Sequence, residues 1–301
     1  VDLETYLYGV VPSEMPASYG LEALKAQAVC ARSYAYRQIL LNGYASYGAH
    51  VDDSVSYQVY NNLPTDDKVI QAVNETAGKV LKFQDEVAVT YYFSTSCGYT
   101  TNETIWKNGL AENTYISGKL LNDSMEKLDL TNEEAFRNFI LNEDYETYDS
   151  GESWYRWDMT VPAEQITANI HAEKDIGSVK DIEVTERNEG GVVQKILVTG
   201  EKGELEIVYE HAIRVALNGK DQKITRANGN ETTGGNMLPS GFFVVDKVEE
   251  DGKVTGFRFR GGGFGHGAGM SQNGANHMAE AGKNCEEILN LFYEGTVLSD
   301  I

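Results

Sequence analysis

Residues 21–41 read LEALKAQAVCARSYAYRQILL, and the rest of the chain is organised around this stretch. Most of its residues are good helix formers, and Asn42-Gly43 is expected to stop the helix. Ala28, Ala31 and Ala35 recur at helical spacing and form a narrow face of small side chains, which suits close packing. The stretch therefore predicts one long helix with closely packed neighbours.

The segment PSEMP at 12–16 precedes this helix and holds one carboxylate, Glu14, between two prolines. Because proline cannot continue a helix and restricts the residue before it, we expect a helix over 3–8 to end at the first proline and a short, stiff turn at Glu14. On the long helix, Lys25 and Arg32 fall on a second stripe, so two cations share one side. This arrangement could be a site for an anionic substrate, or an ordinary loop beside a surface helix.

The composition of the 301 residues indicates a globular protein and limits the classes of partner that it can bind. With 46 acidic against 25 basic residues the formal charge is −21, which argues against general affinity for nucleic acid or anionic lipid. A sugar, a peptide or a protein remains possible as the partner.

No apolar run approaches the roughly 18–20 residues that cross a bilayer. Cys30, Cys97 and Cys285 form no C-x-x-C pair; we expect a buried thiol at Cys30, with one disulfide plus a free thiol as the alternative.

Periodicity and turn residues predict an α+β fold, with a helical core, antiparallel β elements and a smaller inserted α+β unit. The core is expected at 1–120 and 236–301 and the inserted unit at 121–235, with a mobile linker at 227–236. The predicted strands are 79–83, 87–93, 157–161, 182–186, 194–199, 204–209, 242–248 and 255–260. Further helices are predicted at 66–77, 133–141, 163–172, 211–218 and 275–281, and after Asn284.

The glycine-rich stretch 261–274 contains Gly263, Gly265 and Ala268 in the loose pattern of a dinucleotide-binding loop. The context fails, because that loop needs a following βαβ unit and an acidic residue about 20 positions onward. The Gly-Lys-Ser/Thr of a phosphate-binding loop does not occur either. The glycines are better explained by sharp turns and close approach of the backbone. The five histidines lack the spacing of a zinc hydrolase.

Several polar and aromatic residues admit two interpretations. His266 could donate to a substrate or bond a neighbouring carbonyl. The hydroxyls of 94–96 could bind a sugar or their own backbone. The WYRW segment at 154–157 could form a saccharide platform, although a strand that buries alternate rings is favoured. A thiol mechanism that pairs Cys97 with His266 is conceivable but lacks a local motif.

Six sequence blocks occur together in an order that is specific to one family. They are EMP (14–16), LKAQA (24–28), ARSYA (31–35), QVY (58–60), STSCGYT (94–100) and GHGAGMSQNGA (265–275). Through these blocks the chain resembles the SpoIID/LytB family, and within it most closely the SpoIID branch. The resemblance spans essentially the whole chain, including the middle region.

This resemblance implies a lytic transglycosylase, which cleaves the MurNAc–GlcNAc bond of cell-wall glycan and leaves a 1,6-anhydro-MurNAc end. Glu14 stands where the family keeps its catalytic glutamate. Lys25 and Arg32 stand at positions associated with the cleft, and we expect them to hold the lactyl carboxylates of MurNAc. The full set of expected substrate-binding residues is Lys25, Gln27, Arg32, Ser94, Ser96, Tyr99, His266, Ser271 and Gln272. The serines, His266 and Gln272 could equally brace two loops against each other.

One departure from the family concerns zinc. Some relatives carry a zinc-binding Cys-x-x-x-His before the QVY block, and Asp52 and Ser56 occupy those places here. We therefore predict no metal and no other cofactor. A single carboxyl group can serve a transglycosylase as acid and then as base, so Glu14 is expected to act alone. A hydrolase would usually need a second carboxylate, and none of the nearest candidates, Asp52, Asp53 and Glu103, has a compelling pattern for it.

The resemblance also implies partners and a location. The expected partners are glycan strands stripped of their stem peptides, the amidase that strips them, and other engulfment proteins. The expected place is the cell-wall side of the membrane during sporulation, with a membrane anchor that precedes Val1 in the full-length protein. A catalytically silent enhancer of an N-acetylmuramoyl-L-alanine amidase is the main alternative. A cytoplasmic carbohydrate-binding protein is a third, which would leave the Glu14 motif without a purpose.

Overall fold

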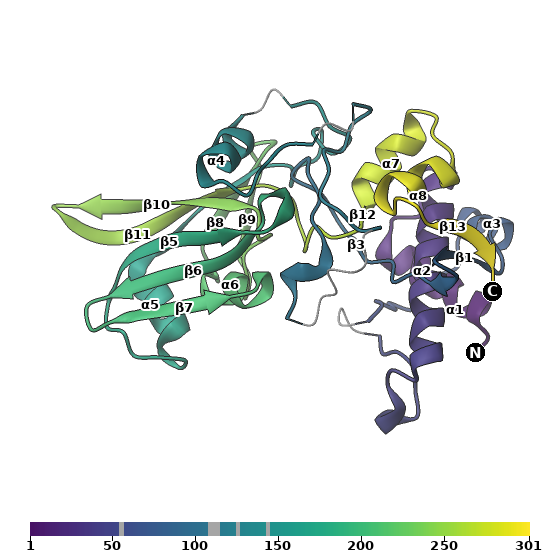
Figure 1. The fold of residues 1–301 in the computed structure, drawn as a ribbon, viewed down its shortest axis with the longest axis horizontal. Helices are drawn as coiled ribbons and strands as arrows, with labels where there is room; N and C mark the ends of the chain where they lie inside the picture. Colours follow the sequence, from purple (N-terminus) through teal and green to yellow (C-terminus); the bar gives the residue numbers. More distant parts are fainter. Residues whose placement is uncertain (54–56, 108–114, 125–126, 143–144) are drawn as a thin grey trace. The chain divides into compact units, whose positions relative to one another are not determined.

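The computed structural model describes residues 1–53, 57–107, 115–124, 127–142 and 145–301. These residues form helices and antiparallel sheets, which confirms the predicted α+β class (Figure 1). They divide into two compact units, of which unit 1 comprises Val1–Tyr92 and Gly269–Ile301, and unit 2 comprises Phe93–Ala268.

Unit 2 is an insertion in unit 1, because the chain enters it at Phe93 and leaves it at Ala268. The sequence predicts an inserted unit at 121–235 that is the smaller part, whereas unit 2 is longer and is the larger of the two. The difference arises because loops on both sides of 121–235 pair inside unit 2. Thr95, for example, forms an antiparallel bridge with Phe264.

Unit 1 is built around α2 (Leu21–Leu41), whose bounds confirm the predicted long helix. Asn42 ends it in the left-handed conformation, with a φ of 50°. Helices α1, α3, α7 and α8 and strand β1 all contact α2. The buried alanines of α2, which include Ala28 and Ala31, allow this close approach on several sides.

The other elements of unit 1 come from both ends of the chain, as Figure 1 shows. The helices are α1 (Leu3–Glu14), η1 (Ala45–Tyr47), α3 (Asp67–Glu75), α7 (Gln272–Glu280) and α8 (Cys285–Phe292). The strands are β1 (Lys79–Phe83), β2 (Glu86–Val87), β3 (Tyr92–Phe93), β12 (Met270–Ser271) and β13 (Val297–Asp300). Strand β1 lies between β13 and β2 in an antiparallel sheet, and β3 pairs with β12. The strand predicted at 87–93 is thus two short strands, and β13 was not predicted.

Helix α1 is longer than expected, because it continues through Pro12 and ends at Glu14. The prediction that Pro12 ends this helix is wrong. A proline here removes one helical hydrogen bond, and the Met15 amide still donates to the Val11 carbonyl at 2.9 Å. Met15 caps the helix and adopts extended backbone angles, as expected for a residue that precedes a proline. Glu14 therefore stands on the last turn of a helix and not on a separate stiff turn.

The described part of unit 2 forms two antiparallel sheets, α-helices and short 3-10 helices. The larger sheet has the strand order β10 (Phe243–Glu250), β11 (Lys253–Gly261), β4 (Trp157–Pro162), β8 (Lys223–Arg226) and β9 (Glu231–Thr233). The smaller sheet has the order β5 (Val179–Arg187), β6 (Val193–Gly200) and β7 (Glu204–Val208). The helices are η2 (Glu103–Ile105), α4 (Glu133–Leu141), α5 (Ala163–His171), η3 (Glu189–Gly191) and α6 (Glu210–Ala216).

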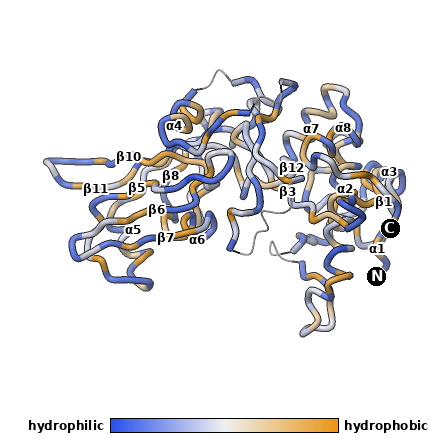
Figure 2. Tube along the Cα trace, in the orientation of Figure 1, coloured by the Kyte–Doolittle hydropathy of each residue, from blue (hydrophilic) through white to orange (hydrophobic). Residues whose placement is uncertain are grey.

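One hydrophobic core joins the two sheets of unit 2 to α5 and α6, with Ile166, Ile196 and Phe259 fully buried in it. Figure 2 shows hydrophobic residues along β6, β7 and β10 and hydrophilic residues at the outer β10–β11 turn. The predicted linker at 227–236 is wrong for part of its length, because β9 lies within it and pairs with β8. Its asparagines and glycines form the turn of a hairpin, which composition alone does not distinguish from a linker.

The close packing of α2 predicts that Ala28→Leu destabilises the protein. Ala28 is fully buried, so extra methylene groups must displace neighbours, and the free energy of unfolding should fall by about 1–3 kcal/mol. Leu40→Ala on the same helix is the control, because Leu40 is exposed and its loss should change stability by less than about 0.5 kcal/mol. Urea unfolding followed by circular dichroism measures both, and equal effects of the two variants would contradict the packing argument.

Candidate active site around Glu14

The carboxyl group of Glu14 is half-buried in unit 1 and is held by uncharged donors. Its Oε1 accepts a hydrogen bond from the backbone N–H of Val59 at 2.8 Å. The side chains of Tyr92 and Gln272 lie near this carboxyl group and act on its pKa as hydrogen-bond donors. Three distant segments of the chain therefore converge on one carboxylate at the end of α1.

Burial raises the pKa of Glu14 above the ordinary value of 4.5, and the bonds from Val59, Tyr92 and Gln272 oppose that shift without cancelling it. Val11 and Met15, which lie close to Glu14 in the chain, are fully buried. None of the described residues shifts this pKa through an opposite charge. The environment therefore favours the protonated acid more than a surface glutamate would.

A second layer of phenols and amides orients these donors. The Gln58 Nε2 donates to the Tyr92 hydroxyl at 3.2 Å and to the Ala31 carbonyl at 3.1 Å. The Tyr6 hydroxyl donates to the Gln58 Oε1 at 3.2 Å, and its ring stacks on that of Tyr60. Burial raises the pKa of both Tyr6 and Tyr92, so their phenols stay protonated donors at neutral pH.

Gln27 and Gln272 lie beside this cluster, as part of the predicted site. The Gln272 Nε2 donates to the Gln27 Oε1 at 3.4 Å, which links the start of α7 to α2. Gln27 is fully buried, and its Nε2 has no hydrogen-bond partner among the described residues. Ser271 is also buried, and its Oγ accepts from the Gly274 amide at 3.2 Å as the N-cap of α7.

Lys25 lies on a different face of α2 from Gln27. At 3.6 residues per turn, Lys25 is about 160° and Arg32 about 140° around the helix from Gln27. The Lys25 Nζ forms ion pairs with Glu22 at 2.8 Å and Glu75 at 2.5 Å. Both side chains therefore lie on the side of α2 that is away from Gln27, and the predicted role of Lys25 in holding a lactyl carboxylate at some distance from Glu14 stays a prediction.

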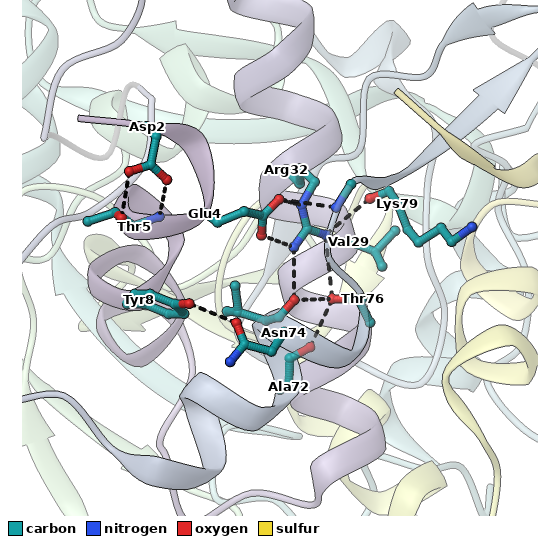
Figure 3. A network of polar contacts seen from close by, with 12 residues as sticks. Asp2, Glu4, Thr5, Tyr8, Val29, Arg32, Ala72, Asn74, Thr76 and Lys79 are labelled. Carbon is teal, nitrogen blue, oxygen red and sulfur yellow. Dashed lines mark hydrogen bonds and ion pairs between the residues drawn. The ribbon is translucent and has the colours of Figure 1, made fainter.

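Arg32 is fully buried and lies at the centre of a polar network that joins α1, α2, α3 and β1 (Figure 3). Its Nε and Nη2 donate to the two carboxylate oxygens of Glu4 at 2.8 and 2.7 Å. Nη1 donates to the Lys79 carbonyl at 3.1 Å and Nη2 to the Val73 carbonyl at 3.3 Å. Because this guanidinium has no exposed surface, we assign it to the support of the fold and not to an anionic sugar.

The predicted site residues of the STSCGYT block belong to unit 2, where each has internal partners. The Ser96 Oγ donates to the Asp149 carboxylate at 2.7 Å and is buried. The Tyr99 hydroxyl donates to the Leu128 carbonyl at 3.3 Å, and its ring is buried. Ser94 is half-buried, and its hydroxyl lies 3.1 Å from that of its neighbour in sequence. The contacts of Ser96 match its bracing alternative, and the buried Tyr99, which was expected to bind substrate, has a comparable internal contact.

His266 is half-buried in unit 2 and lies between two aromatic rings. The ring centroids of Phe93 and Trp106 are 5.6 and 5.2 Å from that of His266. Its Nδ1 accepts a hydrogen bond from the Ala268 amide at 3.2 Å.

Cys97 is fully buried, and burial raises the pKa of its thiol to about 11, which disfavours a thiolate mechanism. All three cysteines are buried free thiols, which confirms the prediction for Cys30.

Among the described residues, no three histidine, cysteine, aspartate or glutamate side chains gather as metal ligands would. Asp52 is described, whereas Ser56, at the other position of the relatives' zinc motif, lies outside the described residues. The same part of the chain contains no helix with the length and hydropathy to span a membrane.

Sequence reasoning missed Tyr6, Gln58 and Tyr92 as neighbours of Glu14. Gln58 was available as a signal, because it belongs to the QVY block that carries the resemblance. Tyr6 and Tyr92 gave none, since each stands in a segment that is predicted only as a helix or a strand. The Val59 contact is made by the backbone, to which side-chain patterns do not point.

Comparisons with known proteins match both units. The SpoIID model, described as stage II sporulation protein, matches residues 1–83, and a domain of unknown function (DUF8618) matches residues 103–269. The chain is 28% identical to stage II sporulation protein D of Bacillus subtilis, over the whole chain and 75% of that relative. It is 28% identical to an amidase enhancer of the same organism, over 97% of the chain and 40% of that relative. It is 30% identical to an uncharacterized protein of Brachyspira hyodysenteriae, over the whole chain and 67% of that relative.

The network of Arg32 predicts that Arg32→Ala removes about 3 kcal/mol of stability, because it leaves buried carbonyls and part of the Glu4 carboxylate without a partner. Lys79→Ala is the matched control, since the Lys79–Asp300 pair is exposed and should contribute less than about 1 kcal/mol. Thermal unfolding measures both. A stable Arg32→Ala protein that had lost only glycan binding would restore the substrate role of Arg32.

The raised pKa of Glu14 predicts a pH-dependent effect of Glu14→Gln on stability. Between pH 4.5 and the raised pKa, the folded wild type holds a proton that the unfolded chain has released, so its stability falls as the pH rises. The variant lacks this titration, so its melting temperature should exceed that of the wild type at pH 7 and approach it near pH 4. Glu75→Gln should behave in the opposite sense, because its pKa is lowered by Lys25. If the difference in melting temperature between Glu14→Gln and the wild type stayed constant with pH, the burial argument would be contradicted.

Proposed function

This chain belongs to the SpoIID family, and we propose that it is a lytic transglycosylase that cleaves MurNAc–GlcNAc bonds in bacterial cell-wall glycan. The observation that carries the proposal is the shielded carboxyl group of Glu14, whose pKa is raised and whose contacts are uncharged donors. A carboxyl group that must be protonated to start a reaction and ionised to finish it needs such an environment.

In the proposed first step, protonated Glu14 donates its proton to the glycosidic oxygen as the bond from that oxygen to C1 of MurNAc breaks. The leaving sugar departs with a new hydroxyl group, and positive charge develops at C1. The Glu14 carboxylate that remains is stabilised by the Val59 amide and the Tyr92 and Gln272 side chains. These donors prefer the ionised form and therefore strengthen as the proton leaves.

In the proposed second step, the carboxylate of Glu14 removes the proton from the C6 hydroxyl group of the same MurNAc. The C6 oxygen attacks C1, which forms the 1,6-anhydro ring and returns Glu14 to its protonated state. No water acts as nucleophile, so the reaction needs no second carboxylate to activate one. A hydrolase would usually hold such a carboxylate about 5–10 Å from the first.

The contacts of the described residues refine which side chains we propose for glycan binding. Gln272 is retained, because its side chain lies at Glu14. Gln27 is fully buried and bonds Gln272, so we propose that it positions Gln272 and does not itself contact the glycan. Ser94 and His266 of unit 2 are retained as half-buried polar groups. Ser96, Tyr99 and Ser271 are proposed to brace loops and a helix end, and Lys25 and Arg32 to stabilise unit 1.

We further propose a role in remodelling the cell wall during sporulation, in keeping with the name of the Bacillus relatives. The substrate would be glycan from which an amidase has removed the stem peptides, and other engulfment proteins would act beside it. The protein would work on the extracytoplasmic side of the membrane, held there by an anchor in the full-length protein.

A non-catalytic enhancer of an amidase is the second candidate, because an amidase enhancer is among the relatives. An enhancer would bind glycan and raise the activity of an added amidase without changing glycan itself. The two functions differ in what the purified protein does alone to peptide-free glycan, since only the transglycosylase releases anhydro products.

The proposal predicts that purified wild-type protein releases 1,6-anhydro-MurNAc products from peptide-free glycan and that Glu14→Gln lowers the rate by about 100-fold or more. The amide can accept hydrogen bonds but can neither donate the acidic proton nor take it back. Mass spectrometry of the released sugars measures both rates.

Glu86→Gln serves as the control, because Glu86 is an exposed glutamate of unit 1 and should keep full activity. Wild-type protein that releases no anhydro product but stimulates an amidase would replace the transglycosylase with the enhancer. Full cleavage by a natively folded Glu14→Gln variant would remove Glu14 from the reaction.

A further inference from the structure

Unit 2 contains a pocket of about 300 Å³ where β4, β8 and β11 end beside α4. Three arginines line it, one from each strand region: Arg156, Arg226 and Arg260. The strand register pairs Arg226 with Trp157 and Arg260 with Asp158, so neighbouring strands deliver these side chains to one place. A cluster of cations is notable in a chain whose formal charge is −21.

The positive charge of this pocket is only partly balanced. Arg260 pairs with Asp246 at 2.7 Å. One carboxylate, that of Asp158, lines the pocket, and it is already paired with Arg258, which lies outside the lining. Arg156 donates to backbone carbonyls, among them that of Cys97 at 2.8 Å. Within the described ranges, no carboxylate forms an ion pair with Arg156 or Arg226.

Hydrogen-bond donors are also in excess at this place. The Nε atoms of Arg156, Arg226 and Arg260 and the indole Nε1 of Trp157 are buried without a hydrogen-bond partner among the described residues. Trp157 itself is 3% exposed, so its indole N–H is shielded from bulk solvent. Buried donors without acceptors are costly, and their gathering at one pocket indicates a missing acceptor.

An aromatic pair adjoins the pocket through Arg226. The Arg226 guanidinium lies 5.4 Å from the ring centroid of Trp154, and the Trp154 and Phe264 rings are 4.7 Å apart. Phe264 is 42% exposed, so the pair is open to solvent on one side. Flat apolar rings beside polar groups suit the apolar face of a sugar ring.

From these observations we infer that unit 2 carries a binding site for the oxyanion of a saccharide, a carboxylate or a phosphate. Planar guanidinium groups bind both anions through parallel hydrogen bonds, and Arg226 has the fewest competing contacts of the three. The oxyanion occupies the arginine pocket, and its sugar ring lies against Trp154 and Phe264. The inference deepens the proposed function, on which it rests for the choice of a glycan, and it places anion binding away from Lys25 and Arg32.

The test measures binding, not cleavage, by isothermal titration of the full chain with three probes. GlcNAc–MurNAc carries the lactyl carboxylate, chitobiose is the matched neutral disaccharide, and glycerol phosphate carries a phosphate. We expect GlcNAc–MurNAc or glycerol phosphate to bind about tenfold or more tightly than chitobiose. Which of the two anionic probes binds identifies the carboxylate or the phosphate as the ligand group.

Arg226→Ala should lower the affinity for the anionic probe by about tenfold. The melting temperature should stay unchanged, because no hydrogen bond of this side chain supports the fold. Lys223→Ala on the same strand is the control and should bind as the wild type does, since Lys223 is exposed and lies outside the pocket. Equal binding of charged and neutral disaccharides, absence of binding, or unchanged affinity in Arg226→Ala would each overturn the inference. Loss of cleavage chemistry in the Glu14 experiments would not affect these binding results, so the two proposals fail separately.

Discussion

The ion pair between the fully buried Arg32 and the half-buried Glu4 is the interaction on which unit 1 depends. Glu4 lies in the first turn of α1 and Glu14 in its last, about 15 Å apart along the helix. By holding Glu4 with two hydrogen bonds, Arg32 attaches the start of α1 to α2, and its remaining donors attach α3 and β1. The far end of the same helix is thereby directed to where Glu14 meets the QVY segment.

The environment of Glu14 combines burial with neutral hydrogen bonding, and this combination matters for the proposed chemistry. A nearby lysine or arginine would lower the pKa and keep the carboxyl group ionised. The placement of Lys25 and Arg32 on another face of α2, each with its own carboxylate partner, keeps such charges away. Tyr92 and Gln272 can instead stabilise the carboxylate when it forms, without preventing its protonation beforehand.

Charge is distributed differently in the two units. This difference assigns the proposed anion recognition and the proposed acid–base chemistry to different units. In unit 1, Lys25 and Arg32 of the long helix form ion pairs with carboxylates of the same unit. In unit 2 the arginines of one pocket exceed the described carboxylates that face them. Recognition of an anionic ligand is therefore better supported in unit 2, whereas the candidate acid and base lies in unit 1.

The sequence by itself determined the α+β class, the helix at 21–41, the strand at 79–83 and the helix at 133–141, because periodicity and helix propensity are local properties. Its ordered motifs also singled out Glu14, whose catalytic role stays a prediction. The sequence did not determine which side chains of α2 face Glu14. It also did not show that α1 continues as a helix through Pro12. Helical spacing correctly placed Lys25 and Arg32 on one stripe but could not say what covers it. Only the tertiary structure decided that acidic side chains from α1 and α3 cover that stripe and that uncharged groups meet the carboxyl group, because both depend on contacts between segments far apart in the chain.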